Sequence, residues 1–234
     1  METPSIWLRT ICRKNGLPVS DNQLALLQDY VAQLLNWNLK VNLISRQDEE
    51  LVWQNHILHS VSLLFKIKLR RPSVIMDLGT GGGLPGIPLK ILLPDVDFLL
   101  IDSTRKKVIA VQEILRGLGL PGIEAVWGRA EDLVKQKNLL SHFDYIITRA
   151  VAPLTMLVSW SKPFLRSAPT AEQMEDDCRL SPPALIALKG GDLEEEIAET
   201  NRREKIGLIK VVDLVYSGSE EISSTGKKIV VVKL

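Results

Sequence analysis

An acidic residue and a group of glycines lie together between residues 74 and 88, and they are the part of the chain most suited to chemistry. An apolar run leads into Asp77, a glycine-rich turn follows, and a second apolar run begins near Ile87. This order is typical of a strand, a tight turn and a helix. Because glycine has no Cβ, such a turn lets the backbone approach a ligand closely. The stretch therefore predicts a ligand site at the end of a strand.

The glycines over residues 81–86 match the G-x-G-x-x-G pattern of dinucleotide-binding proteins, and Asp102 lies at the distance expected for a ribose-binding acid. A pyrophosphate, however, needs free backbone N–H groups and no neighbouring anion. Asp77 places a negative charge just before this turn, and Pro85 removes one donor from it. The charges thus disfavour a nicotinamide dinucleotide, the ligand of the oxidoreductase alternative.

S-adenosyl-L-methionine carries an ammonium and a sulfonium group, so an acid beside a glycine turn complements its charge. The D-x-G-x-G order favours this methyl donor, with contacts expected from Asp77, Gly79 and Gly81. Two readings stay open at this point. The turn could simply close a strand onto a helix, or the chain could be a non-catalytic binding module on a cofactor-binding fold.

The elements needed to position this turn follow from the alternation of apolar runs after residue 73. Strands are predicted over 73–78, 97–102, 123–127, 143–148 and 184–189, with helices near 86–93, 104–118, 153–165 and 192–206. Such alternation gives a parallel sheet covered by helices on both faces. Runs at 208–216 and 227–234 predict a final antiparallel hairpin. The fold class is therefore α/β, with the seven-stranded Rossmann-like sheet of class I methyltransferases.

Residues 1–70 are helical in pattern and contain a capping-box sequence at Ser20–Gln23 followed by apolar residues at helical spacing. We interpret them as an N-terminal helical cap packed on a methyltransferase domain, residues 71–234. The polar, proline-flanked segment 166–183 predicts a loop on the side of the sheet away from the cofactor.

Ligands of open α/β sheets bind at the carboxyl ends of the strands, which selects the residues that follow each predicted strand. Asp102 is placed to accept hydrogen bonds from two ribose hydroxyls, or else to cap the next helix. Glu131 could bind the adenine edge, or simply complement a helix dipole. The full set expected at this rim is Asp77, Gly79, Asp102, Ser103, Thr104, Arg129, Ala130, Glu131, Arg149, Lys189 and Gly190.

Composition limits the other classes. The 234 residues carry a formal net charge of +1, so any nucleic-acid surface must be a local patch. No signal peptide or apolar run long enough to span a bilayer is visible, which predicts a soluble cytoplasmic protein.

The sequence does not indicate a metal site. The two cysteines, Cys12 and Cys178, lack the spacing of metal ligands and are expected to be reduced thiols. A metal role for His56 and His59 is set aside in favour of a hydrogen-bonded helical pair.

A cluster of cations, Arg105-Lys106-Lys107, lies in the first turn of a predicted helix. Cations there are disfavoured by about 0.3–1 kcal/mol each. An anionic partner such as a phosphate backbone would explain the placement, and a tolerated surface cluster is the alternative.

Several segments together resemble the ribosomal RNA small-subunit methyltransferase G family, also called glucose-inhibited division protein B. The resemblance runs from the N-terminal cap to the fifth predicted strand, and its most specific part is the extension Leu84-Pro85-Gly86-Ile87-Pro88 after the glycine turn. The other matching segments are Trp37-Asn38 with Asn42-Leu43, His56-Ile57-Leu58 with Ser60, Asp102-Ser103 with Lys106, Phe143-Asp144 with Thr148-Arg149-Ala150, and Ala187-Leu188-Lys189-Gly190.

The resemblance implies methylation of a guanine N7 in small-subunit (16S) ribosomal RNA by S-adenosyl-L-methionine, with the RNA or the small ribosomal subunit as partner. We expect a monomer. Carried onto this sequence, the cofactor contacts would be Gly79, Leu84, Asp102, Ser103, Thr104, Ala130, Glu131 and Arg149.

Arg149 and Lys189, beside the expected position of the methyl group, are candidates for holding an RNA phosphate or the guanine O6. The alternatives are a clamp on the cofactor carboxylate and a structural cation at a strand end. A small-molecule methyltransferase remains the alternative enzyme.

Overall fold

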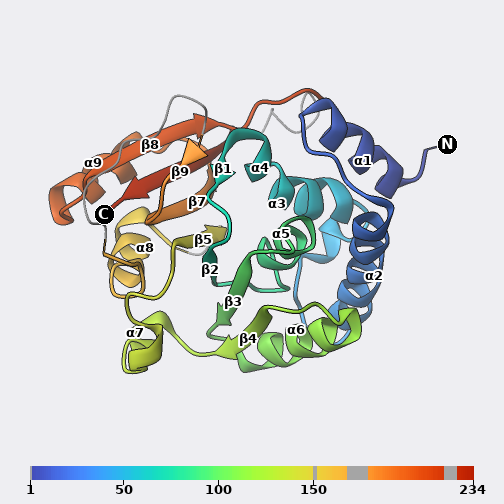
Figure 1. The fold of residues 1–234 in the computed structure, drawn as a ribbon, viewed down its shortest axis with the longest axis horizontal. Coiled ribbons are helices and arrows are strands. Elements are labelled where there is room, and N and C mark those ends of the chain that lie inside the picture. The colour runs from blue at the N-terminus through green and yellow to red at the C-terminus, as the bar shows by residue number, and fades with distance from the viewer. Residues whose placement is uncertain (1, 150–151, 168–178, 219–225) are drawn as a thin grey trace.

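The computed structural model describes residues 2–149, 152–167, 179–218 and 226–234, and its centre is a seven-stranded sheet (Figure 1). The strand order is β4-β3-β2-β5-β7-β9-β8. The first five of these pair in parallel, and β9 is antiparallel to both of its neighbours. This confirms the predicted α/β class with a terminal hairpin. The strands are β2 (Val74–Leu78), β3 (Asp97–Asp102), β4 (Ile123–Trp127), β5 (Tyr145–Arg149), β7 (Ala184–Gly190), β8 (Leu208–Asp213) and β9 (Lys227–Lys233).

Helices cover both faces of the sheet, as its two buried faces require. Side chains alternate along each strand, so Ile75 and Leu100 point into one core while Met76 and Leu99 point into the other. Helices α5 (Gly86–Leu92) and α6 (Arg105–Leu118) contribute to the first core, and α7 (Ala130–Leu133) and α8 (Leu154–Ser161) to the second, beside α9 (Glu194–Arg203).

The N-terminal helices pack on the first core. They are α1 (Pro4–Lys14), α2 (Asp21–Asn38), the 3₁₀ turn η1 (Arg46–Asp48), the π-helical segment η2 (Trp53–Leu58), α3 (His59–Val61) and α4 (Leu63–Lys66). The predicted capping box is present, because Ser20 and Gln23 each accept the other's backbone N–H. Contacts of α2 with α5 and α6 place these helices beside the glycine turn. The boundary drawn at residue 70 stays a prediction.

A two-stranded parallel pair, β1 (Lys68–Leu69) with β6 (Arg179–Leu180), was not predicted from the sequence. The Tyr145 hydroxyl links β6 to the residue after β1, since it donates to Leu180 O and accepts from Arg70 N. This pair contains part of the segment 166–183 that was expected to be a loop; residues 168–178 of it, with Cys178, lie outside the described residues.

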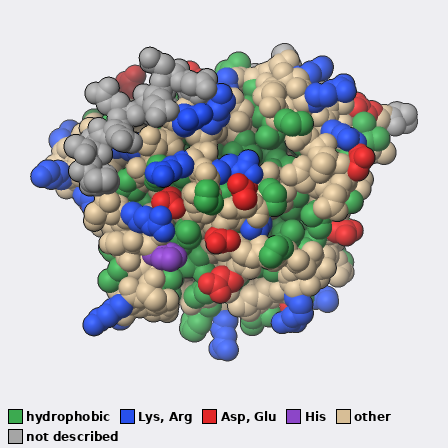
Figure 2. Space-filling model, viewed as in Figure 1, with side chains coloured by type: hydrophobic (Ala, Val, Ile, Leu, Met, Phe, Trp, Pro, Cys, Tyr) green, Lys and Arg blue, Asp and Glu red, His purple; other side chains and the backbone are tan. Residues whose placement is uncertain are grey.

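Charges of both signs are interspersed on the face seen in Figure 2, in keeping with the small net charge. An anionic partner would therefore need a local group of cations. Among helices of the described ranges, none combines the length and apolar character required to cross a membrane.

Candidate methyl-donor site

A cavity of about 310 Å³ opens at the carboxyl ends of β2, β3 and β4, where ligands of such sheets bind. Carboxylates of Asp102 and Glu131 meet apolar side chains there, which suits a ligand with one polar and one flat apolar part. The cavity is lined by Leu78, Gly79, Ile101, Asp102, Ser103, Gly128, Arg129, Ala130, Glu131 and Trp160.

Asp102 ends β3 and ties two turns together at the edge of this cavity. Its Oδ2 accepts the Gly81 N–H at 2.9 Å, and its Oδ1 accepts the Thr104 N–H at 2.7 Å. Each carboxylate oxygen can accept more than one hydrogen bond, so both keep capacity for ribose hydroxyls. The helix-capping alternative is realised only in part, since Thr104 is the N-cap of α6 and Asp102 serves its N–H.

Asp77 was expected to face the methyl donor, but its carboxylate points to the backbone of the glycine turn. Its side chain is fully buried and is not among the cavity-lining residues. Its Oδ2 accepts hydrogen bonds from Thr80 Oγ1 at 2.6 Å and from the Gly86 N–H at 2.8 Å. The carboxylate therefore fixes both ends of the glycine turn to β2. Its other oxygen, Oδ1, is buried with no hydrogen-bond partner among the described residues.

The burial of Asp77 has a cost that depends on pH. Desolvation raises the pKa of its carboxyl to about 6, although the bonds from Thr80 and Gly86 and the charge of Arg149 act in the opposite direction. Between the usual value of 3.8 and about 6, the folded protein holds a proton that the unfolded chain releases. The contribution of this group to stability is therefore present at low pH and is lost as pH rises through this window.

We expect Asp77→Asn to abolish this pH dependence. Asparagine can still accept the bonds from Thr80 and Gly86 but has no charge to bury, so the variant should gain about 3 kcal/mol on the wild type between pH 4 and pH 6. Urea unfolding of both proteins at pH 4, 5, 6 and 7 measures the difference. A difference that stays constant over this range would show that Asp77 does not titrate as described.

The N-terminal helices support the glycine turn from its other side. The Tyr30 hydroxyl, fully buried on α2, donates to Gly82 O at 3.0 Å. A Cβ at Gly82 would lie 2.8 Å from Leu34 Cδ1, so a larger residue there would require Leu34 to move. Leu84, expected to touch the cofactor, is itself buried at this turn. The turn is thus held rigidly between the N-terminal helices and the sheet.

Arg149 ends β5 outside the lining of this cavity and meets the π-helical segment η2. Its guanidinium contacts His56 Nδ1 at 3.0 Å and donates to Asn55 O at 3.4 Å, and His56 Nε2 lies 3.4 Å from Asp48 Oδ2. Burial and the Arg149 charge lower the pKa of His56 to about 4, so this imidazole is neutral at pH 7. Arg149 therefore has neutral partners and, within the described ranges, no carboxylate within 4 Å.

The ammonium group of Lys189 already has protein partners, so little of its hydrogen-bonding capacity is available to a substrate. Its Nζ donates to Glu196 Oε1 at 2.7 Å and to Ala152 O at 3.1 Å, and the side chain is largely buried. The structure thus favours the structural alternative for Lys189, as a link from the end of β7 to α9.

Half of the ten residues expected to hold the cofactor line the cavity: Gly79, Asp102, Ser103, Ala130 and Glu131. Two more, Gly81 and Thr104, do not line the cavity but donate backbone hydrogen bonds to Asp102, which does. The other three, Asp77, Leu84 and Arg149, lie outside the lining, behind or beside the glycine turn. Sequence reasoning missed Trp160, which reaches the cavity from α8, and Gly128, which follows β4. A glycine directly after a predicted strand was a usable signal for Gly128, but nothing in the sequence distinguishes Trp160 from a core residue.

The strand order, the glycine turn after β2 and the acid after β3 together define a class I S-adenosylmethionine-dependent methyltransferase. Solved structures share the fold. Fibrillarin, a pre-rRNA processing protein of Methanococcus jannaschii, superposes with a TM-score of 0.53 at 14% identity over 74% of this chain and 72% of its own. The CurJ carbon methyltransferase superposes with a TM-score of 0.53 at 12% identity, over 99% of this chain and 71% of its own.

The chain belongs to the rRNA small subunit methyltransferase G family, whose sequence model matches residues 23–223. Among curated relatives, the ribosomal RNA small subunit methyltransferase G of Chlorobaculum tepidum is 40% identical over 97% of this chain and 96% of its own length. That of Chlorobium phaeobacteroides is 34% identical over 97% and 94%. The resemblance seen in the sequence is confirmed.

Proposed function

We propose that this chain transfers a methyl group from S-adenosyl-L-methionine to N7 of a guanine in small-subunit (16S) ribosomal RNA. The observation that carries the proposal is the cavity at the ends of β2, β3 and β4, in a chain of this family. The bound donor supplies an electrophilic methyl group on a sulfonium.

The residues of the cavity fit the adenosine part of this donor. Asp102 would accept hydrogen bonds from the ribose hydroxyls, because both of its oxygens are fixed by backbone N–H groups with lone pairs to spare. Leu78, Ile101, Ala130 and Trp160 offer apolar surface for a flat base. Glu131, which also lines the cavity, would accept a hydrogen bond from the exocyclic amine of the base.

Arg149 is the candidate for an anion at the other end of the site. A half-buried guanidinium with neutral partners is costly, and an anionic group would offset that cost. The donor carboxylate and an RNA phosphate are both suitable, and η2 would position Arg149 for either through Asn55 and His56.

Guanine N7 has a free lone pair and no proton to lose, so its attack on the methyl group needs alignment more than a general base. The role of this chain is then to hold two ligands rigidly. The glycine turn is fixed for this purpose at three points, by hydrogen bonds with Tyr30, Asp77 and Asp102. As further parts of the proposal, the protein would act as a monomer in the cytoplasm, with the helices of residues 1–70 as a cap on the catalytic domain.

Methyl transfer to ribosomal particles tests the proposal. With radiolabelled S-adenosyl-L-methionine, wild-type protein should label small subunits from cells that lack it and leave large subunits unlabelled. Labelling of a metabolite fraction in place of RNA would support a small-molecule methyltransferase instead. No transfer to RNA, subunits or metabolites would contradict catalysis altogether.

A further inference from the structure

A second concave surface, of about 770 Å³, lies between α2, the loop after it and α6, apart from the residues that line the donor cavity. Its lining is polar and basic, and no acidic side chain belongs to it. The residues are Asn38, Leu39, Lys40, Asn42, Leu43, Ile44, Ser45, Arg46 and Lys107. We call this surface the basic groove.

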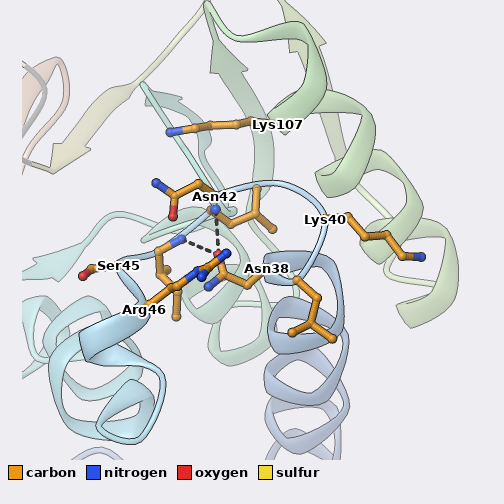
Figure 3. Close-up of a pocket in the computed structure, with 9 residues that line it drawn as sticks. Asn38, Lys40, Asn42, Ser45, Arg46 and Lys107 are labelled. Atoms are coloured by element: carbon orange, nitrogen blue, oxygen red, sulfur yellow. Dashed lines mark hydrogen bonds between the residues drawn. The ribbon is translucent and has the colours of Figure 1, made fainter.

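The loop that forms one wall of the basic groove is held in place by a buried side chain (Figure 3). Asn38 Oδ1 accepts the N–H groups of Leu43 at 2.7 Å and Ile44 at 3.0 Å, and its Nδ2 donates to Glu49 Oε1 at 2.6 Å. Leu43 and Ile44 are buried. Their exposed neighbours Asn42, Ser45 and Arg46 are therefore presented on a fixed backbone rather than on a free loop.

Two cations face the basic groove from separate elements. Lys107 extends from the first turn of α6 and Arg46 from η1, with Asn42 between them, whereas Lys40 points away and lies over the Trp37 ring (Figure 3). Within the described residues, neither the Arg46 guanidinium nor the Lys107 ammonium forms an ion pair or a hydrogen bond. Other cations of the chain do have an acidic partner, as Arg71 has in Asp95.

The positions of these two cations lower the stability of the folded chain. Lys107 lies in the first turn of α6, where the helix dipole disfavours a positive charge, and that turn contains no acid. Like charges that face one polar groove repel each other unless an anion lies between them. The arrangement is explained if the groove binds a polyanion.

The basic groove and the donor cavity lie on two sides of the same glycine turn. A Cβ on Gly82 would be 3.2 Å from Leu43 Cβ, so the groove loop packs directly on the turn. The next residue back, Gly81, donates to Asp102, which lines the donor cavity. A chain lying in the groove would thus pass within reach of the methyl donor.

We infer that the basic groove binds the sugar–phosphate backbone of a single-stranded RNA segment next to the target guanine. Arg46 and Lys107 would each bind a phosphate, and Asn42 would hydrogen-bond a ribose hydroxyl or a base edge. A protein partner fits less well, because the centre of a protein interface is apolar and depleted in charge. The inference rests on the proposed function and adds to it the surface that positions the substrate.

Charge-removing variants test this inference. The variants are Arg46→Gln, Lys107→Gln and the double variant, and Lys210→Gln is the matched control, an exposed lysine on β8 at the opposite edge of the sheet. Each groove variant should weaken binding of deproteinised small-subunit RNA about three- to tenfold. The slope of log affinity against log salt should fall by about 0.7 for each phosphate that the variant no longer neutralises. Lys210→Gln should behave as wild type.

Two further readouts separate the outcomes. Calorimetry with S-adenosyl-L-methionine should give the same donor affinity for all variants, and the KM for undermethylated subunits should rise while kcat changes little. Groove variants that bind RNA like Lys210→Gln would overturn the inference, and weaker binding seen only with assembled subunits would point to a ribosomal protein instead. If wild-type protein methylates no RNA, the proposed function itself fails.

Discussion

Replacing Asp102 by alanine is expected to weaken the binding of S-adenosyl-L-methionine about a hundredfold, since hydrogen bonds to a charged group contribute about 1.5–3 kcal/mol. The Asp102 carboxylate acts only as an acceptor: it binds the N–H groups of Gly81 and Thr104, and would bind the ribose hydroxyls of the donor as well. Its removal frees both turns that border the cavity. Isothermal titration calorimetry measures the effect.

Asp132→Ala is the matched control for this experiment. Asp132 lies in the same short helix as Glu131, pairs with Lys135 on the surface and does not line the cavity, so its removal changes the net charge equally. Asp102→Asn, which retains the shape and one acceptor oxygen, should fall between alanine and wild type. If Asp102→Ala binds the donor as tightly as Asp132→Ala does, the donor does not occupy this cavity.

The second large effect is expected at Gly86, the first residue of α5. A Cβ there would lie 2.2 Å from Leu100 Cδ2 and 2.7 Å from Asp77 Oδ2, both inside the core. Gly86→Ala should therefore lower the free energy of unfolding by about 3 kcal/mol, at the upper end of overpacking costs. It should also disturb the bond from the Gly86 N–H to Asp77 and so weaken donor binding.

Gly119→Ala gives the contrast. Gly119 ends α6 with φ of 62°, but a Cβ there would meet nothing within 4 Å. Only the strain of the left-handed conformation remains, about 1–2 kcal/mol. Urea unfolding of both variants compares steric overlap with backbone strain. A larger destabilisation at Gly119 than at Gly86 would contradict the close packing described for the glycine turn.

The sheet could be predicted from the sequence because its strands are short apolar runs between turn signals. The run ending at Asp102 was placed at residues 97–102, the bounds of β3. The parallel pair β1–β6 was missed because two-residue strands have no periodicity to detect. Helix α8 is shorter than the predicted 153–165, since the chain turns after Ser161 to bring Leu165 beside Phe143.

The candidate site was predictable in position but not in orientation. A strand-end acid beside glycines indicates where a ligand can bind, yet whether the carboxylate faces ligand or backbone depends on contacts across the fold. Asp77 turns to Thr80 and Gly86, whereas Asp102, one strand away, lines the cavity. Lys189 likewise forms an ion pair with Glu196, and the sequence spacing of these two residues does not reveal that contact.

The identity of the modified nucleoside tests the account most directly. Small subunits from cells lacking this protein are incubated with purified protein and S-adenosyl-L-methionine, and the RNA is digested to nucleosides for mass spectrometry. The account predicts 7-methylguanosine in the small-subunit RNA, at up to one added methyl group per RNA, absent without protein and strongly reduced with Asp102→Ala. A methyl group on another atom, on large-subunit RNA or on no RNA at all would contradict it.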